Sequence, residues 1–98
     1  MRRSIREMSE PVPNPVRAAI LDLTAARGAG KTICPSEAAR AVSGDMWRRL
    51  MPDVRAEAVR LAKAGQIAIY RKGRPVDPGS FRGVYRLGLP RGETGSDE

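Results

Sequence analysis

The stretch Pro52–Gly73, PDVRAEAVRLAKAGQIAIYRKG, changes its hydrophobic period halfway along, and this change decides the fold. Before Gly65 the apolar residues recur at helical spacing, and they are Val54, Ala58, Leu61 and Ala62. Gly65 is the residue type that most easily takes the left-handed conformation that ends a helix. After it, Ile67 and Ile69 alternate with Ala68 and Tyr70, as in a half-buried strand. The stretch therefore predicts a helix, a strand and then a basic turn at Arg71-Lys72-Gly73.

The charge of the chain is its strongest global feature. It has 18 Lys and Arg against 11 Asp and Glu, a net charge of +7, and 15 of the cations are Arg. Arg suits phosphate because its planar fork makes paired hydrogen bonds. A sequence pI near 10.7 is typical of nucleic-acid-binding domains. The alternative explanation of the charge is a GC-rich genome, which favours Arg and Ala codons whatever the function of the protein.

The composition also argues against several classes of protein. Ninety-eight residues make one domain, and no apolar run approaches the ~20 residues that span a bilayer. The start, MRRSIREMSE, has no hydrophobic segment, so we expect neither a secretory signal nor a membrane role. One Cys and no His offer no disulfide and no metal site. We therefore expect a cytoplasmic protein without cofactor, metal or catalytic residues, and not an enzyme.

Capping signals place three helices along the chain. Asn14 and Pro15 open the first, as N-cap and first helical residue, and it is expected to run to Arg27. Lys31–Ile33 is expected to pair as a short strand. A second helix starts at Cys34-Pro35, with Glu37 placed for a capping box, and ends at Ser43-Gly44.

The third helical region is expected to be interrupted. Asp45 is taken as the cap of a short helical turn over Met46–Leu50, with Trp47 and Leu50 as core contacts. Pro52 disfavours helix in the residue before it, so the long helix is predicted to begin at Pro52.

The remainder is predicted to be a strand over 66–72, a loop without helix or strand, and a strand over 84–89 that pairs with the first. The prediction is an α+β fold, a winged helix-turn-helix with three main helices, a short first strand and a β-hairpin wing. Residues 14–90 form the domain, 1–13 a flexible arm and 91–98 a disordered acidic tail.

Four spaced motifs carry a family resemblance: KTICPSEAAR (Lys31–Arg40), WRRLMPDVR (Trp47–Arg55), LAKAGQI (Leu61–Ile67) and KGRPVDP (Lys72–Pro78). Together they resemble a small bacterial winged-helix family that is catalogued as a domain of unknown function. The resemblance covers roughly residues 15–90. It implies a fold, and it brings no activity, cofactor or catalytic residue.

The helix over about 52–64 is the candidate recognition helix. Its exposed side is expected to carry Ala56, Val59, Arg60 and Lys63, with Arg55 on one flank. In a major groove, Arg55 and Arg60 are expected to read guanine edges and Val59 a thymine methyl, while Lys63 contacts phosphate. Asp53 and Glu57 oppose this interpretation. The alternative is a solvated face in which Glu57 and Arg60 form a surface pair.

The wing, about 71–86, has the larger charge imbalance. Between Gln66 and Arg91 one acid, Asp77, faces six cations, and these are Arg71, Lys72, Arg74, Arg82, Arg86 and Arg91. Such a wing is expected to lie along the DNA backbone or in the minor groove. Asp77 is interpreted as a turn-former. Arg48 and Arg49, before the long helix, are expected to clamp phosphates together with its N-terminal N–H groups.

Two further motifs give weaker evidence of function. The RGAGKT segment ending at Thr32 lacks the first Gly of a phosphate loop. Cys34 at a helix start could sense redox state, but a small cap residue is the simpler interpretation. The sequence thus predicts a double-stranded-DNA-binding protein, with transcriptional regulation as its suggested role. The alternative is a protein-interaction or dimerisation module whose basic surface meets an acidic partner; RNA binding ranks third, and oligomeric state stays open.

Overall fold

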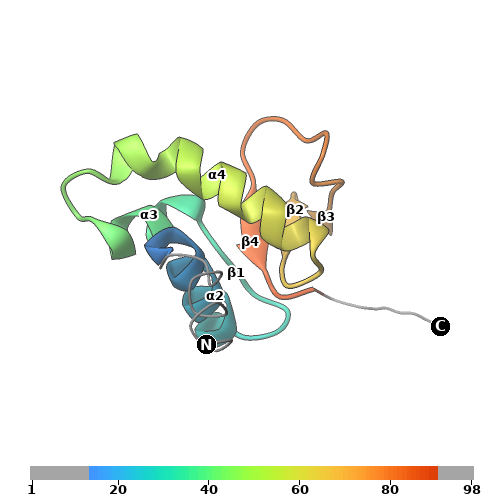
Figure 1. The fold of residues 1–98 in the computed structure, drawn as a ribbon. Coiled ribbons are helices and arrows are strands. Elements are labelled where there is room, and N and C mark those ends of the chain that lie inside the picture. The colour runs from blue at the N-terminus through green and yellow to red at the C-terminus, as the bar shows by residue number, and fades with distance from the viewer. Residues whose placement is uncertain (1–13, 91–98) are drawn as a thin grey trace, which may run out of the picture.

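The computed structural model describes residues 14–90, which form three helices and a four-stranded antiparallel sheet (Figure 1). The elements are α2 (Pro15–Arg27), β1 (Thr32–Ile33), α3 (Pro35–Val42), α4 (Trp47–Lys63), β2 (Ala68–Arg71), β3 (Arg74–Pro75) and β4 (Arg86–Gly88). The predicted α+β class is confirmed, and the layout is consistent with a winged helix. The predicted arm (1–13) and tail (91–98), with Arg91, lie outside the described residues.

The first two helices begin and end where their capping residues predict. The Asn14 side chain accepts a hydrogen bond of 3.0 Å from the Arg17 N–H, and α2 ends before Gly28, which has a φ of 93°. At the start of α3 the Glu37 carboxylate accepts a 2.9 Å hydrogen bond from the Cys34 N–H. This bond, helped by Arg27, holds the pKa of Glu37 below its usual value.

The third helix is not interrupted at Pro52, so the predicted break is wrong. α4 runs without a break from Trp47 to Lys63 with Pro52 inside it. A proline removes one backbone hydrogen bond and crowds the preceding turn. Residues on both sides of it, Leu50 and Val54, nevertheless pack against the same core, and burial of one continuous face outweighs the local cost.

The start of α4 also differs from the expectation. Met46, not Asp45, occupies the N-cap position, and the Met46 N–H donates to the Ser43 hydroxyl at 3.2 Å. The serine that ends α3 therefore also satisfies the turn into α4. The α3–α4 connection is consequently short, as the Ser43-Gly44 signal predicted.

The sheet has the strand order β1-β4-β2-β3. The last strand pairs on both sides, since Leu87 lies opposite Ile33 in β1 and Ile69 in β2. The predicted pairing of the two wing strands is confirmed, although both are shorter than predicted. Gly88 permits the close approach of β1, because a Cβ at that position would lie 2.8 Å from the Lys31 carbonyl oxygen.

β3 lies where an irregular loop was predicted, so that prediction is wrong for Arg74–Pro75. Lys72 and Gly73 have φ values of 53° and 79°. Positive φ at both central residues is typical of the two-residue turn that reverses a strand directly, and it brings Arg74 opposite Arg71. Pro75 is tolerated because β3 is an edge strand.

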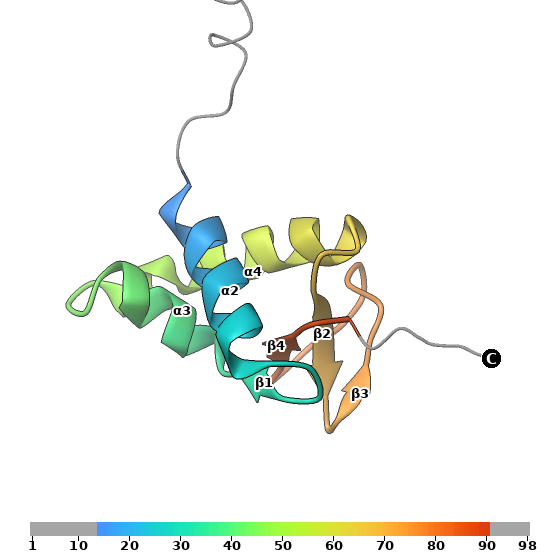
Figure 2. The same cartoon turned by 90° about the horizontal axis from the view of Figure 1, so that it is seen from below.

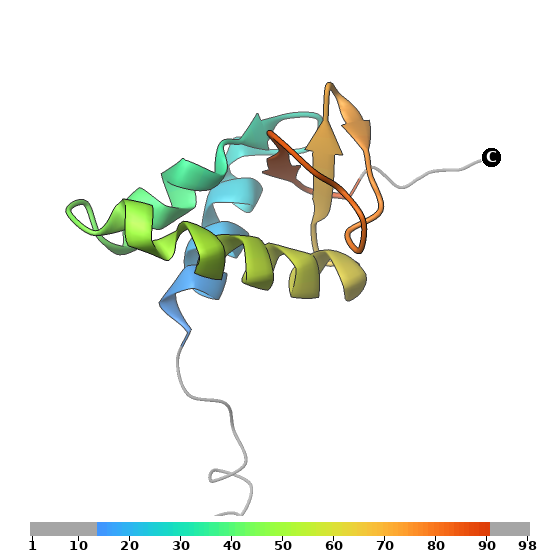
Figure 3. The ribbon, with the colours of Figure 1, turned by 90° about the horizontal axis from the view of Figure 1, so that it is seen from above.

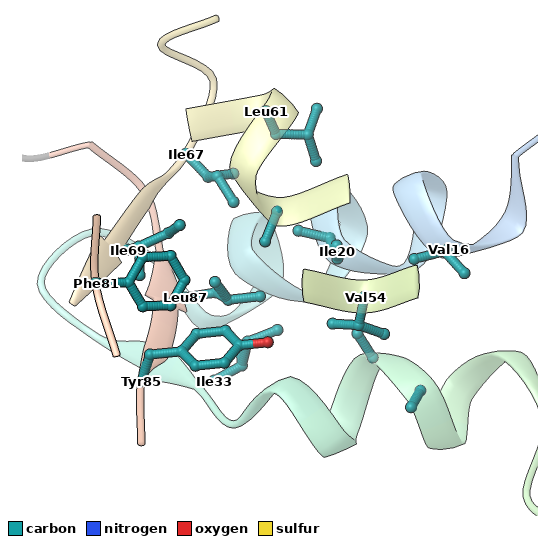
Figure 4. Close-up of a cluster of buried hydrophobic side chains, with 13 residues drawn as sticks. Val16, Ile20, Ile33, Val54, Leu61, Ile67, Ile69, Phe81, Tyr85 and Leu87 are labelled. Carbon is teal, nitrogen blue, oxygen red and sulfur yellow. The ribbon is translucent and has the colours of Figure 1, made fainter. Parts of the chain in front are cut away.

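One core joins the sheet to the helices (Figure 4). Side chains from all three helices and from β1, β2 and β4 meet there, including Ile20, Ile33, Val54, Ile69 and Leu87. Trp47 and Leu50 pack at its edge, as predicted. Tyr70 departs from the predicted alternation: it is buried beside Ile69, and its hydroxyl donates to the Leu89 carbonyl at 2.7 Å.

Candidate nucleic-acid interface

The flank of α4 that faces α2 carries a buried carboxylate. Glu57 is only 3% exposed, and its oxygens accept from Arg17 at 2.7 Å, from Arg60 at 2.7 Å and from the Asn14 amide at 3.2 Å. Burial raises the pKa of Glu57, but the bonds and charges of Arg17 and Arg60 outweigh it, so the pKa is lowered overall. The expected Glu57–Arg60 pair exists, but the expectation that Glu57 is exposed is wrong.

This arrangement fixes Arg60, one of the two predicted guanine readers. Its side chain is 64% exposed, but Nη1 is held on Glu57. Reading guanine requires both parallel N–H groups of the guanidinium on one base edge. The bond of Nη1 to the buried carboxylate fixes the direction of the guanidinium and leaves Nε and Nη2 as its other donors, so Arg60 contributes first to the contact between α4 and α2 at Glu57.

The second predicted guanine reader, Arg55, lies under the wing loop. Its guanidinium stacks 4.0 Å above the Phe81 ring centroid and 5.7 Å from that of Tyr85. Nη2 also donates to the Phe81 carbonyl at 3.0 Å. The two rings meet edge to face with centroids 5.1 Å apart (Figure 4). Arg55 therefore fastens the loop to α4, and burial raises the pKa of Tyr85 beneath it.

Val59 is half-buried and packs against the core, so its predicted place on the fully exposed face is wrong. Arg55, one turn earlier on α4, is the residue that contacts the loop at Phe81 and Tyr85. The predicted cations of α4 are all exposed, and two of them, Arg49 and Lys63, differ from the others in their contacts. Neither makes an ion pair or side-chain hydrogen bond within residues 14–90.

Arg48 is held by a contact that the sequence did not predict. Its guanidinium lies 4.5 Å from the centroid of the Trp47 ring, and that of Arg40 lies 4.3 Å from the same centroid. Arg40 comes from α3 and Arg48 from α4. No local spacing signals such a contact, because the two arginines meet only when the helices pack.

Two cations of the wing support its structure. Arg71 Nε donates to the Val84 carbonyl at 2.9 Å, which ties β2 to the loop. Arg86 donates to the Thr32 hydroxyl at 2.6 Å and to the Thr32 carbonyl at 3.2 Å, which ties β4 to β1. Both arginines bond neutral acceptors, and Arg86 in addition acts on Glu37, whose pKa it helps to lower after the Cys34 N–H and Arg27.

The other three wing cations, Lys72, Arg74 and Arg82, are exposed. None of them makes an ion pair or side-chain hydrogen bond within the described part of the chain. They do not form one patch. Lys72 and Arg74 lie at the β2–β3 tip, which points away from α4 (Figures 2 and 3). Arg82 instead follows Phe81 on the loop that returns to α4.

Asp77 accepts hydrogen bonds from the Gly79 N–H at 3.0 Å and from the Ser80 hydroxyl at 3.4 Å. Its predicted role as a turn-former is confirmed. Cys34 is half-buried, with its sulfur 3.1 Å from the Ser36 hydroxyl oxygen. Within residues 14–90 no three acidic, Cys or His side chains gather as a metal site. Over the same residues, no helix has the length and apolar character needed to cross a membrane.

Comparison with known proteins places the chain in a family. The model of the family described as "Protein of unknown function (DUF3253)" matches residues 13–90, and the chain therefore belongs to that family. The predicted resemblance to a domain of unknown function is confirmed at this level. The comparison with curated proteins gave no match.

Proposed function

We propose that the protein is a cytoplasmic winged helix-turn-helix protein that binds double-stranded DNA, chiefly through the phosphate backbone. The observation that carries the proposal is the excess of positive charge in the wing. Residues 66–90 hold five cations and one acid, Asp77, and the three salt bridges recorded within residues 14–90 all lie outside this segment. Phosphate contacts need such free cations, and they supply most of non-specific affinity.

Backbone binding is favoured over base reading by the state of α4. Both predicted guanine readers have intramolecular partners, Arg55 on the wing loop and Arg60 on Glu57. The cations on α4 and the wing that have no ion pair, side-chain hydrogen bond or ring contact within residues 14–90 are Arg49, Lys63, Lys72, Arg74 and Arg82. Phosphate contacts position a protein without reading sequence. We therefore propose affinity for many duplex sequences, with weak preference among them.

A salt titration tests the proposal. Binding of a fluorescent 16-base-pair duplex is measured by anisotropy between low and moderate salt, and counterion release gives a slope of log K of about −0.9 per phosphate contact. The triple variant Lys72→Gln, Arg74→Gln, Arg82→Gln should reduce this slope by about 2 to 3. Absence of duplex binding at low salt would refute the proposal.

A matched control separates this surface from general loss of charge. Lys31→Gln removes an exposed cation that lies before β1, outside the wing. It should leave the slope nearly unchanged. An equal reduction from Lys31→Gln and from any single wing variant would mean that total charge alone is responsible. Several unrelated duplexes should bind with affinities within about tenfold of each other, since backbone contacts carry no base information.

The alternative, a protein-interaction or dimerisation module, has one observation in its favour. An open groove of about 380 Å³ runs beside α4, lined among others by Pro15, Val42 and Leu50. The exposed acid Asp53 also lines it. Its lining holds two acids, Asp53 and Glu57, against one cation, Arg60, so it does not favour the acidic partner that the charge suggests. Measured mass by light scattering, with and without duplex, distinguishes self-association from DNA binding.

A further inference from the structure

Two arginines from different helices share one aromatic ring at the start of α4. The guanidinium carbons of Arg40 and Arg48 lie 4.3 and 4.5 Å from the centroid of Trp47. Both arginines are exposed, Trp47 is half-buried, and the next residue, Arg49, is exposed as well. We call Arg40, Trp47 and Arg48 the arginine–tryptophan cluster. Three cations thus gather at the α3–α4 connection.

The arginines of the cluster differ from three other arginines of the helices. Arg17, Arg27 and Arg60 each pair with a glutamate at 2.6 to 2.7 Å. Within residues 14–90, neither Arg40 nor Arg48 has a carboxylate partner. Stacking uses the flat face of a guanidinium and leaves its N–H groups, which lie in the plane, available for other acceptors. The ring therefore orients the two forks without consuming their hydrogen bonds.

Electrostatics favours an anion at this place. Two like charges over one ring repel each other, and a bound anion relieves that repulsion. Asp45 lies in the same connection, but it is exposed and makes no ion pair within the described residues. Within the described residues, no ion pair therefore offsets the positive charges of Arg40 and Arg48. Arg with its paired N–H groups matches phosphate oxygens in particular.

The position of the cluster relates it to the wing. It lies at the N-terminal end of α4, and β2 of the wing follows the C-terminal end (Figures 1 and 3). Seventeen helical residues span about 25 Å at 1.5 Å each. The same length covers roughly seven base pairs of duplex at 3.4 Å each. One duplex lying along α4 is therefore long enough to reach both cationic ends.

We propose that the arginine–tryptophan cluster is a second phosphate-binding site that contacts the same DNA duplex as the wing. The inference rests on the proposed function and specifies the length of duplex that the protein contacts. The exposed Lys63 lies at the C-terminal end of α4, Arg82 lies on the wing loop that returns to α4, and the cluster lies at the N-terminal end. A duplex that is too short for both ends loses one set of contacts.

Trp47 provides a direct readout, because it is the only Trp of the chain. Its emission is followed while the 16-base-pair duplex is added, and it should change with the same midpoint as the anisotropy. The double variant Arg40→Gln, Arg48→Gln should reduce the salt slope by about 1.8, the value for two contacts. At 0.1 M salt its affinity should fall at least about tenfold.

Duplex length tests the shared footprint. A six-base-pair duplex, about 20 Å long, should give the wild-type protein nearly the slope that the double variant shows on the long duplex. The double variant should lose little more on shortening. An equal slope for the wild-type protein on both duplexes would overturn the inference.

Asp45→Asn is a second, oppositely signed variant that leaves the ring and both arginines in place. It should raise affinity a few-fold at low salt and leave it unchanged at high salt. This result keeps the inference testable if the double variant, checked by circular dichroism, does not fold. Unchanged affinity in Asp45→Asn together with an unchanged Trp47 emission would overturn it.

The two proposals fail differently. If duplex binds and the wing variants weaken it, while neither the cluster variants nor Trp47 respond, the inference is wrong and the proposed function stands. If no duplex binds at low salt, both are wrong.

Discussion

The helical part of the domain and its wing use arginine in opposite ways. Residues 14–65 hold nine cations and five acids, and residues 66–90 hold five cations and one acid. In the helices three arginines close ion pairs with Glu37 and Glu57. In the wing Arg71 and Arg86 bond neutral oxygens instead. The same side chain therefore neutralises charge in one region and accumulates it in the other.

This difference shows which arginines contribute to stability and which remain for a partner. An exposed ion pair contributes little, but a pair that satisfies a buried carboxylate removes a large desolvation cost. Glu57 is buried and needs its two arginines. The wing has no buried acid among the described residues, so its free cations contribute little to folding. Stability and DNA affinity should therefore respond to different substitutions.

The largest effect on stability is expected at Glu57. Glu57→Gln should lower the free energy of unfolding by about 2 kcal/mol, because two charge-assisted hydrogen bonds are weakened, with allowance for the exposure of the arginines. Urea unfolding followed by circular dichroism measures the change. Asp53→Asn, an exposed acid one turn earlier in α4, is the control and should stay within about 0.5 kcal/mol of wild type. Equal effects would contradict a special role for the buried carboxylate.

Acid should remove the same stabilisation. The folded pKa values of Glu57 and Glu37 are lowered, for Glu57 by Arg17 and Arg60 against the effect of burial and for Glu37 chiefly by the Cys34 N–H. Their contribution is present above the unfolded pKa of about 4.3 and is lost as pH falls through the folded pKa values. The stability difference between wild type and Glu57→Gln should therefore shrink from pH 7 to pH 3. A difference that is constant with pH would show that ionisation of Glu57 is not the cause.

A smaller, local effect is expected at Arg55. Arg55→Ala removes the stack on Phe81 and the bond to its carbonyl, at a cost of about 1 kcal/mol. Amide hydrogen exchange should accelerate over residues 79–84 more than in α2. Arg49→Ala, which removes an exposed cation of the same helix that has no partner within the described residues, should leave the exchange unchanged. Uniform acceleration throughout the domain would mean that Arg55 supports the core and not the loop.

The smallest effect, and the one of opposite sign, is expected at Lys72. Its φ of 53° makes it the one residue other than Gly with positive φ in the described range. Lys72→Asn should raise stability by about 0.5–1 kcal/mol, because Asn tolerates this conformation better. Lys72→Ala has no such advantage and should give no gain. Under the proposed function both variants weaken DNA binding equally, since each removes one cation. Comparison of the two variants therefore distinguishes the effect of backbone strain on stability from the effect of charge on DNA binding.

Several elements were predictable because their signals are local. Asn14 with Pro15 and Gly28 fixed both ends of α2, and Glu37 fixed the start of α3, since caps depend on residues within one turn. The failures share another cause. Pro52 inside α4 and the burial of Glu57 depend on contacts with residues far away in the chain. A local rule for proline or for an amphipathic face cannot include them.

The candidate interface shows the same division. The sequence identified an excess of cations in the wing, and counting charges needs no structure. It assigned Arg55 and Arg60 to base reading because a helical wheel treats every exposed position as free. Phe81 and Glu57 occupy these arginines only after the loop and α2 have packed against α4. The stack of Arg40 and Arg48 on Trp47 likewise joins two helices.

The sequence by itself determined the α+β class, the order of the three helices and of β1, β2 and β4, the turn-forming role of Asp77 and the positive charge of the wing. These follow from periodicity, capping and composition, which are properties of neighbouring residues. The tertiary structure alone decided which cations are paired and which are exposed without a partner in the described domain. The physical reason is that a guanidinium takes whichever face or acceptor packing brings within a few ångströms, and at Glu57, Phe81 and Trp47 packing brings it from another element.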